Sequence, residues 1–122
     1  SARDVQTAHK QWYFGKSLDG FTPIGPCIVT ADAFADYPPR LGIRSFVNGE
    51  KRQDSNTALQ IFDIDHVIAE LSQGMTLKAG TIIATGTPAG VGMGMDPPQF
   101  LKPGDVVRCE IEGIGTLTNP VK

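Results

Sequence analysis

The sequence has few of the features that mark a metal site, a secreted disulfide scaffold or a membrane protein. Its two cysteines, Cys27 and Cys109, have no cysteine or histidine near them at metal-ligand spacing, so we expect buried, reduced thiols. The motifs His-x-x-x-His, Cys-x-x-Cys and Gly-x-Ser-x-Gly are absent, which leaves zinc and serine-hydrolase mechanisms without support. His9 lies in a polar stretch close to Lys10, and His66 lies between Asp65 and Val67; at such positions solvent-facing or core-edge histidines outnumber catalytic ones. No run approaches the roughly 18 consecutive apolar residues of a membrane span.

An excess of charge of one sign is also lacking. Lysine and arginine number 11 against 13 acidic residues, a formal charge of -2, so no broad positive surface is available for phosphates or anionic lipid. We therefore expect neither nucleic acid nor membrane as a partner, and a cytoplasmic location. With 122 residues, 40% of them hydrophobic, and no internal repeat, the chain is sized for one domain with a small core.

Two β-hairpins are predicted from what is present. The strand-like residues 43–47 lead into Asn48-Gly49, which tolerates positive φ at both positions and favours a type I′ turn. Apolar and polar residues alternate over 105–112, which predicts a half-buried strand that turns back through residues 113–118.

One helix is predicted, over about residues 63–73. Its apolar residues recur at i, i+3, i+4 and i+7, which places Ile64, Val67, Ile68 and Leu71 on one face. Asp63 is suited to cap its start, and Gly74 to end it in the left-handed conformation.

A glycine-rich loop over residues 86–94 follows residues 81–85, whose β-branched content predicts a buried strand. Backbone N–H groups of such a loop can approach a ligand oxygen closely. No Gly-Lys-Ser/Thr follows and no βαβ unit surrounds it, so it is neither a phosphate loop nor a dinucleotide fingerprint. From these residues alone, a site-forming loop and a structural turn both remain open. The predicted strands precede and follow a single helix along the chain, and strand–helix–strand alternation is not repeated. This order predicts an α+β, mainly β fold with a roll or barrel-like sheet.

The opening residues are a second candidate site. Arg3, Asp4 and Gln6 bring a planar cation, a carboxylate and an amide within four residues, and Lys16 follows the aromatic run 12–14. Arg3 is suited to fork onto a substrate carboxylate, and a partly desolvated Lys16 to hold an enolate or oxyanion. The alternative is a solvated arginine and lysine on a surface turn.

Five blocks of the sequence, in order over nearly the whole chain, carry a family resemblance. They are SARDVQ (1–6), GKSLDGFTPIGP (15–26), VNGEKRQDSNT (47–57), ATGTPAGVG (84–92) and LKPGDVV (101–107). The chain resembles the carboxy-terminal catalytic domain of the fumarylacetoacetate hydrolase family, with residues 1–122 expected to form a single partial domain of a longer protein. The resemblance implies a mixed β-roll, a homodimer, and Mg²⁺ or Mn²⁺ held by carboxylates.

The resemblance also implies residue roles. Arg3 and Gln6 resemble the family's substrate-contacting pair, Lys16 its oxyanion or carbanion stabiliser, and Thr87 the residue at the substrate's carboxylate end. Asp4 resembles an orienting or structural acceptor rather than a metal ligand. The family's metal ligands, a Glu-x-Glu pair and an Asp two positions before the serine that is Ser1 here, are expected upstream, so none is assigned within this chain.

The implied activity is chemistry on a small dicarboxylic or oxo-acid through a metal-stabilised enolate. It is either carbon–carbon hydrolysis of an acylpyruvate or fumarylacetoacetate-type acid or decarboxylation of oxaloacetate. An isomerase or hydratase acting on hydroxymuconate-like acids is the alternative within the same fold. A third alternative is an inactive fragment or assembly module. The isolated chain is expected to be inactive and, with unpaired strand edges, to associate.

Overall fold

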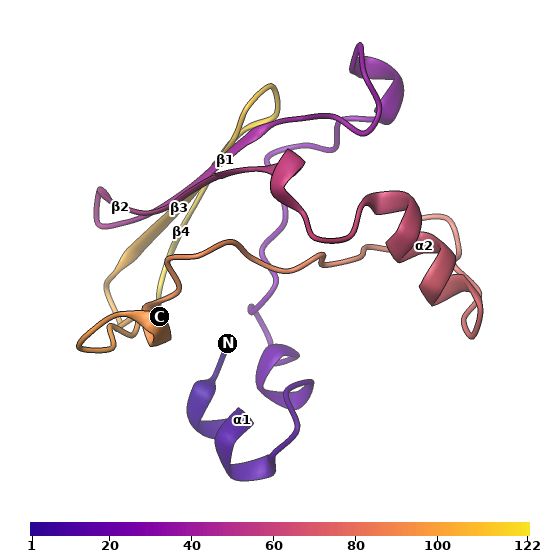
Figure 1. The fold of residues 1–122 in the computed structure, drawn as a ribbon. Coiled ribbons are helices and arrows are strands. Elements are labelled where there is room, and N and C mark those ends of the chain that lie inside the picture. The colour runs from indigo at the N-terminus through magenta and orange to yellow at the C-terminus, as the bar shows by residue number, and fades with distance from the viewer.

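The computed structural model describes all residues 1–122, and its centre is a four-stranded sheet in the order β2-β1-β3-β4 (Figure 1). The strands are β1 (Gly42–Val47), β2 (Glu50–Asn56), β3 (Val106–Ile111) and β4 (Gly115–Pro120). The predicted α+β, mainly β class is confirmed. Every pairing is antiparallel, so the parallel component of the expected mixed sheet is not formed by this chain. Two hairpins supply two of the three pairings, and the long connection from β2 returns β3 antiparallel to β1.

The turn between β1 and β2 confirms the predicted hairpin. Asn48 has φ 52° and Gly49 has φ 86°, the positive values that a type I′ turn requires. Asn48 also ties this turn to the next strand, because its Nδ2 donates to Asp105 Oδ1 at 2.9 Å and its Oδ1 accepts from Val106 N at 2.8 Å. The hydrogen bond from Asn48 is the main reason that the pKa of Asp105 is lowered. One residue therefore fixes both the first hairpin and the start of β3.

The predicted helix is confirmed as α2 (Ile64–Ser72), and a shorter helix, α1 (Arg3–His9), lies at the amino terminus. Asp63 caps α2, since its Oδ1 accepts from His66 N at 2.8 Å. The predicted left-handed end at Gly74 is wrong. The helix ends at Ser72, and its C-cap residue Gln73 is in the right-handed region. Hydrogen bonds of the i→i+3 type, including Gly74 N to Leu71 O at 3.4 Å, tighten the final turn.

The strand predicted over residues 81–85 is also wrong. The segment is extended but pairs with no strand, and Ile82 is 67% exposed. β-branched residues favour a pleated, half-buried surface, but a strand forms only where another edge supplies hydrogen bonds. The sheet contains only β1 to β4, and none of these strands pairs with the segment.

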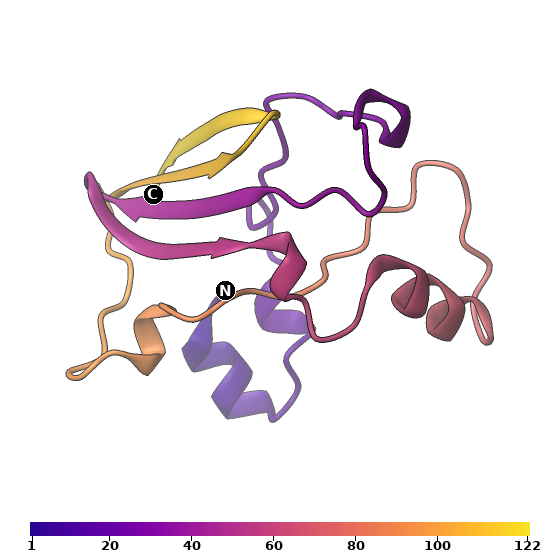
Figure 2. The ribbon, with the colours of Figure 1, turned by 45° about the horizontal axis from the view of Figure 1, so that its top comes forward.

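The chain has almost no buried interior. Only Gln6 and Gly15 are buried, and no hydrophobic residue is. The substantial contacts between elements are those of the paired strands and of α1 with the following turn, so no helix packs closely on the sheet (Figure 2). Cys27 and Cys109 are free, as predicted, but both are exposed rather than buried, because the chain has no hydrophobic core to enclose them. The alternating burial expected over residues 105–112 is absent for the same reason.

The solvent-accessible surface area shows how little of the chain is buried. It is 9421 Å² for a chain of 13.0 kDa, whereas a compact monomer of that mass exposes about 6,300 Å². No helix has both the length and the apolar character needed to cross a bilayer.

Candidate functional site

Three of the predicted site residues, Arg3, Gln6 and Lys16, lie on one small unit. Helix α1 and the 3₁₀ turn η1 (Phe14–Lys16) are joined by a hydrogen bond from Ala2 N to Gly15 O of 2.8 Å. Lys16 Nζ donates to Ser1 Oγ at 3.0 Å, which holds the ammonium group against the start of α1. We call α1, η1 and the residues between them the amino-terminal unit.

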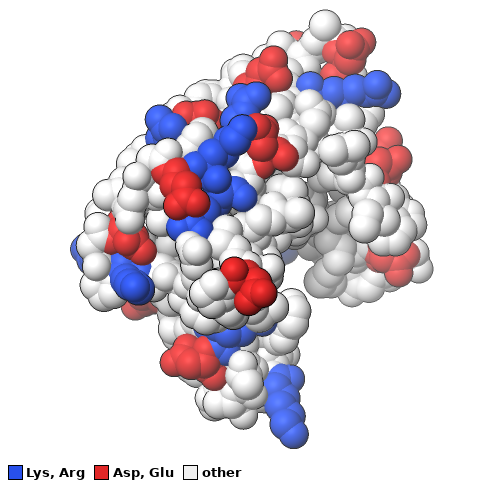
Figure 3. Space-filling view, turned by 60° about the vertical axis from the view of Figure 1, so that its left-hand side comes forward, with Lys and Arg blue, Asp and Glu red and all other residues white.

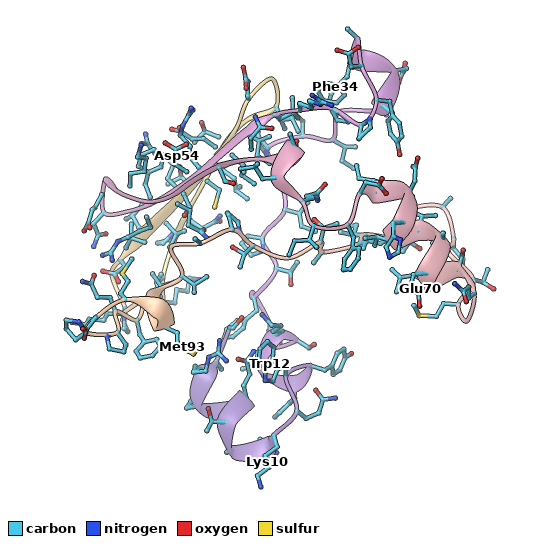
Figure 4. All side chains as sticks on the ribbon, in the orientation of Figure 1. Lys10, Trp12, Phe34, Asp54, Glu70 and Met93 are labelled. Carbon is cyan, nitrogen blue, oxygen red and sulfur yellow. The ribbon has the colours of Figure 1, made fainter.

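Arg3 lies at the end of this unit that is nearer the sheet. Its guanidinium carbon is 5.3 Å from the centre of the Trp12 ring, within cation–π distance. In Figure 4, Trp12 lies on the sheet side of the unit, whereas Lys10 projects from its far end. The arginine cation is thus held on the side where the rest of the chain lies.

Two positively charged side chains therefore lie on this unit, Lys16 against Ser1 and Arg3 over Trp12. Elsewhere the surface carries mixed charge, and Figure 3 shows basic and acidic side chains interspersed over one face. Some of these charges form ion pairs, such as Lys51–Asp54 at 2.6 Å. Two cations on one small unit are suited to an anionic ligand.

Glycine is required at position 15 by close packing. A Cβ on Gly15 would lie 2.5 Å from Gln6 Cγ and 2.8 Å from Ala2 O. The Gln6 side chain is 1% exposed, and neither its Oε1 nor its Nε2 has a hydrogen-bond partner. A buried unpaired amide is costly, and here it is covered by its own unit. The predicted contact between Gln6 and substrate therefore stays a prediction.

Thr87 lies on a different part of the chain, where the glycine-rich loop rests on β2. Gln53 Nε2 donates to Thr87 Oγ1 at 2.8 Å and to Pro88 O at 3.0 Å. Gly90, with φ 102°, has no room for a side chain, because a Cβ would overlap the carbonyl oxygen of Arg52. Packing therefore explains the glycine at position 90, while Thr87 remains exposed to ligands.

A cavity of about 410 Å³ opens beside Thr87, within the range of small-molecule sites. It lies between the end of β2, the 3₁₀ turn η3 (Thr57–Leu59), helix α2 and the segment 85–88. Its walls mix hydroxyl and amide groups with apolar side chains, among them Asn56, Gln60, Phe62, Val67 and Thr85. This mixture suits a small polar molecule with a carbon backbone.

The structure thus brings Arg3, Gln6 and Lys16 together and places Thr87 apart from them. Figures 1 and 2 both show α1 on the same side of the sheet as the segment that carries Thr87, but no hydrogen bond joins the two. The sequence reasoning missed Gln53 as a site residue. Its only sequence signal is that it is a polar residue in the block 47–57. Polar residues are equally typical of an exposed strand face.

No group of three or more histidine, cysteine, aspartate or glutamate side chains in this chain is placed to hold a metal ion. Asp4 in particular has no partner carboxylate near it that would complete such a set. The donor set of these residues does not fit a divalent ion, so we derive no step through one.

Comparison with known protein families defines the class of protein. The family model described as "Fumarylacetoacetate (FAA) hydrolase C-terminal" matches residues 1–122. The chain therefore belongs to the fumarylacetoacetate hydrolase family, and the resemblance carried by the five sequence blocks is confirmed.

Individual relatives are similar along nearly the whole chain. Oxaloacetate tautomerase YisK of Bacillus subtilis (strain 168) is 50% identical over 121 residues, which cover 99% of this chain and 40% of that protein. The fumarylacetoacetate hydrolase of psychrophilic Exiguobacterium antarcticum superposes with a TM-score of 0.94 at 55% identity, covering 100% of this chain and 43% of that one. Maleylpyruvate hydrolase from Sphingobium sp. SYK-6, solved with manganese(II) and pyruvate, has a TM-score of 0.77 at 44% identity, with 88% and 38% covered. The chain thus spans about two fifths of the length of these relatives.

Proposed function

We propose that this chain is a partial domain of an enzyme that stabilises the enolate of a short 2-oxo diacid, with tautomerisation of an oxaloacetate-type acid as its reaction. The observation that carries the proposal is that Arg3, held over Trp12, and Lys16, held against Ser1 Oγ, lie on the same small amino-terminal unit. Similarity at 50% identity to a protein named oxaloacetate tautomerase supports this choice of substrate class.

Each residue has a defined part in the proposal. Arg3, held over Trp12, pairs with one carboxylate of the acid through its planar fork. Lys16 lies beside the carbonyl oxygen and stabilises the negative charge that forms there when a proton leaves the adjacent carbon. Thr87 binds the other carboxylate, so that the acid lies between the amino-terminal unit and the glycine-rich loop. This position agrees with the two parts lying on one side of the sheet (Figure 1).

A second candidate reaction is hydrolysis of a carbon–carbon bond in an acylpyruvate-type acid, the reaction class implied by the name of the maleylpyruvate hydrolase neighbour. Both reactions require the same enolate, so Lys16 and Arg3 serve either. They differ in whether water must attack a carbonyl carbon, and product analysis separates them: hydrolysis yields two smaller acids, whereas tautomerisation yields one acid that keeps all of its carbon atoms.

The proposal extends to the whole protein in three respects. It includes Mg²⁺ or Mn²⁺, which would supply Lewis-acid polarisation of the dicarbonyl unit and would be held by carboxylates outside this chain. The manganese in the Sphingobium structure supports it. It also includes a homodimer and a cytoplasmic location, as expected from the sequence.

The test removes the positive charge from Lys16 in the complete protein, supplied with Mg²⁺ or Mn²⁺. Interconversion of oxaloacetate enol and keto forms is followed by ultraviolet absorbance for wild type, Lys16→Ala and the control Lys78→Ala, whose exposed side chain makes no hydrogen bond or ion pair. We expect kcat to fall by about 10²–10³ in Lys16→Ala, as for loss of one oxyanion-stabilising group, and not in Lys78→Ala. Equal kcat values for Lys16→Ala and wild type would remove Lys16 from the mechanism.

A further inference from the structure

Gln53 joins the sheet to the loop that carries Thr87. It pairs across the hairpin with Ser45, and the Ser45 hydroxyl donates to Gln53 Oε1 at 2.8 Å. On its other side the amide nitrogen reaches both Thr87 Oγ1 and Pro88 O. The register of the hairpin shifts beside this pair, so that Arg52 is the extra residue of a bulge. A bulge turns neighbouring side chains away from the regular pleat, and this one lies directly beside Gln53.

The chemistry of these partners fixes which way the amide faces. The Pro88 carbonyl oxygen only accepts hydrogen bonds, so the Gln53 atom 3.0 Å from it must be the nitrogen. The two hydrogens of that nitrogen then go to Pro88 O and Thr87 Oγ1. The oxygen of the amide is left facing the Ser45 hydroxyl, which can donate to it.

This arrangement determines the direction of the Thr87 hydroxyl hydrogen. A hydroxyl has one hydrogen to donate, and the Thr87 oxygen already accepts from Gln53. The hydroxyl hydrogen has no acceptor within the chain, and Thr87 is exposed beside the cavity. An ionised carboxylate only accepts hydrogen bonds, so it is the chemical group that this hydrogen suits.

We infer that Gln53 is a positioning residue, which holds the Thr87 hydroxyl as a donor toward a substrate carboxylate and thereby sets the preference for anionic substrates. The inference deepens the proposed function and rests on it for the contact between Thr87 and the acid. Gln53 itself touches no substrate; it acts through Thr87. Because Thr87 binds the carboxylate in the ground state and the transition state alike, the loss should appear in KM more than in kcat.

Two substitutions of Gln53 separate its effect on the direction of the Thr87 hydroxyl from its contribution to packing. Gln53→Met keeps the length of the side chain and removes the amide, so that the Thr87 hydroxyl is free to rotate. Gln53→Glu offers only acceptors, so the hydroxyl turns inward to donate to it, and a negative charge is added. With oxaloacetate and the complete protein, we expect KM to rise about tenfold in Gln53→Met and about a hundredfold in Gln53→Glu, with kcat changed less than about threefold.

A double-mutant cycle with Thr87 tests whether Gln53 acts through the Thr87 hydroxyl. Thr87→Val removes the donor and should raise KM about as much as Gln53→Met, while Thr87→Ser, which keeps a hydroxyl, should restore most of the affinity. In the Thr87→Val background, Gln53→Met should add less than about twofold, because the group through which it acts is gone. Gln73→Met at the C-cap of α2 is the matched control, and thermal unfolding shows whether each variant remains folded.

The outcomes distinguish this inference from the function on which it rests. Unchanged KM in Thr87→Val contradicts the proposed carboxylate contact and the inference with it. If Thr87→Val raises KM but the Gln53 variants do not, the proposed contact stands and the inference is wrong. Independent effects of Gln53→Met and Thr87→Val, multiplying in the double variant, also contradict it, since a residue that merely supports the fold would behave in that way.

Discussion

Replacing Gly15 with alanine tests whether the amino-terminal unit is built as closely as the structure indicates. The new Cβ would lie 2.5 Å from Gln6 Cγ and 2.8 Å from Ala2 O, both below the closest normal approach. The Ala2 carbonyl is backbone and also accepts from Gln6 N at 3.0 Å, so it cannot move without loosening the first turn of α1. We expect a loss of about 1–3 kcal/mol in the free energy of unfolding, as for other overpacked positions.

The control for this change is Gly74→Ala. Gly74 has a negative φ and no atom within 4 Å of the Cβ position, so alanine should be neutral or stabilise by up to about 1 kcal/mol. Urea unfolding of the complete protein measures both variants. The double variant Gly15→Ala, Gln6→Ala should recover part of the loss, because it removes one of the two overlaps. Equal unfolding midpoints for Gly15→Ala and Gly74→Ala would refute the packing argument.

Two further predictions concern the hairpin and the exposed surface. In Asn48→Ala the pKa of Asp105, now lowered mainly by Asn48, should rise toward its usual value in an NMR titration. A lowered carboxyl pKa stabilises the fold above the unfolded value of about 3.9, and that stability is lost as pH falls through the folded pKa. The variant should therefore lose part of this pH-dependent stability, and an unshifted Asp105 titration would contradict the prediction. The isolated 122-residue chain should bind the dye ANS and sediment as associated species, because no hydrophobic residue is buried; a monomer that binds no dye would contradict this.

Local sequence signals predicted the parts of the fold that depend on local chemistry. Asn48-Gly49 identified its hairpin because positive φ is a property of those two residues. Asp63 identified the start of α2 because a capping oxygen acts within three residues. The prediction at Gly74 failed because hydrogen bonds of the i→i+3 type closed the end of the helix without a left-handed residue.

Features that depend on distant residues were predicted poorly. The segment 81–85 has the composition of a strand, but strand formation depends on an available edge, which composition does not reveal. Gln53 was missed because its role depends on Thr87, 34 positions away. The resemblance to the family predicted Arg3, Lys16 and Thr87 as candidates, but not that the Gln6 amide is enclosed by its own unit.

The exposed surface has a consequence for how the site is completed. The chain exposes about 3,000 Å² more than a compact protein of its mass, whereas a standard protein interface covers about 800 Å² per partner. A second copy docked through one such interface would leave most of this excess exposed. The surfaces of the amino-terminal unit and of the loop at Thr87 belong to that open region, and no packed core fixes their separation. The distance between Lys16 and Thr87, which decides the length of the acid that fits, is therefore set by whatever covers this surface as well as by the chain itself.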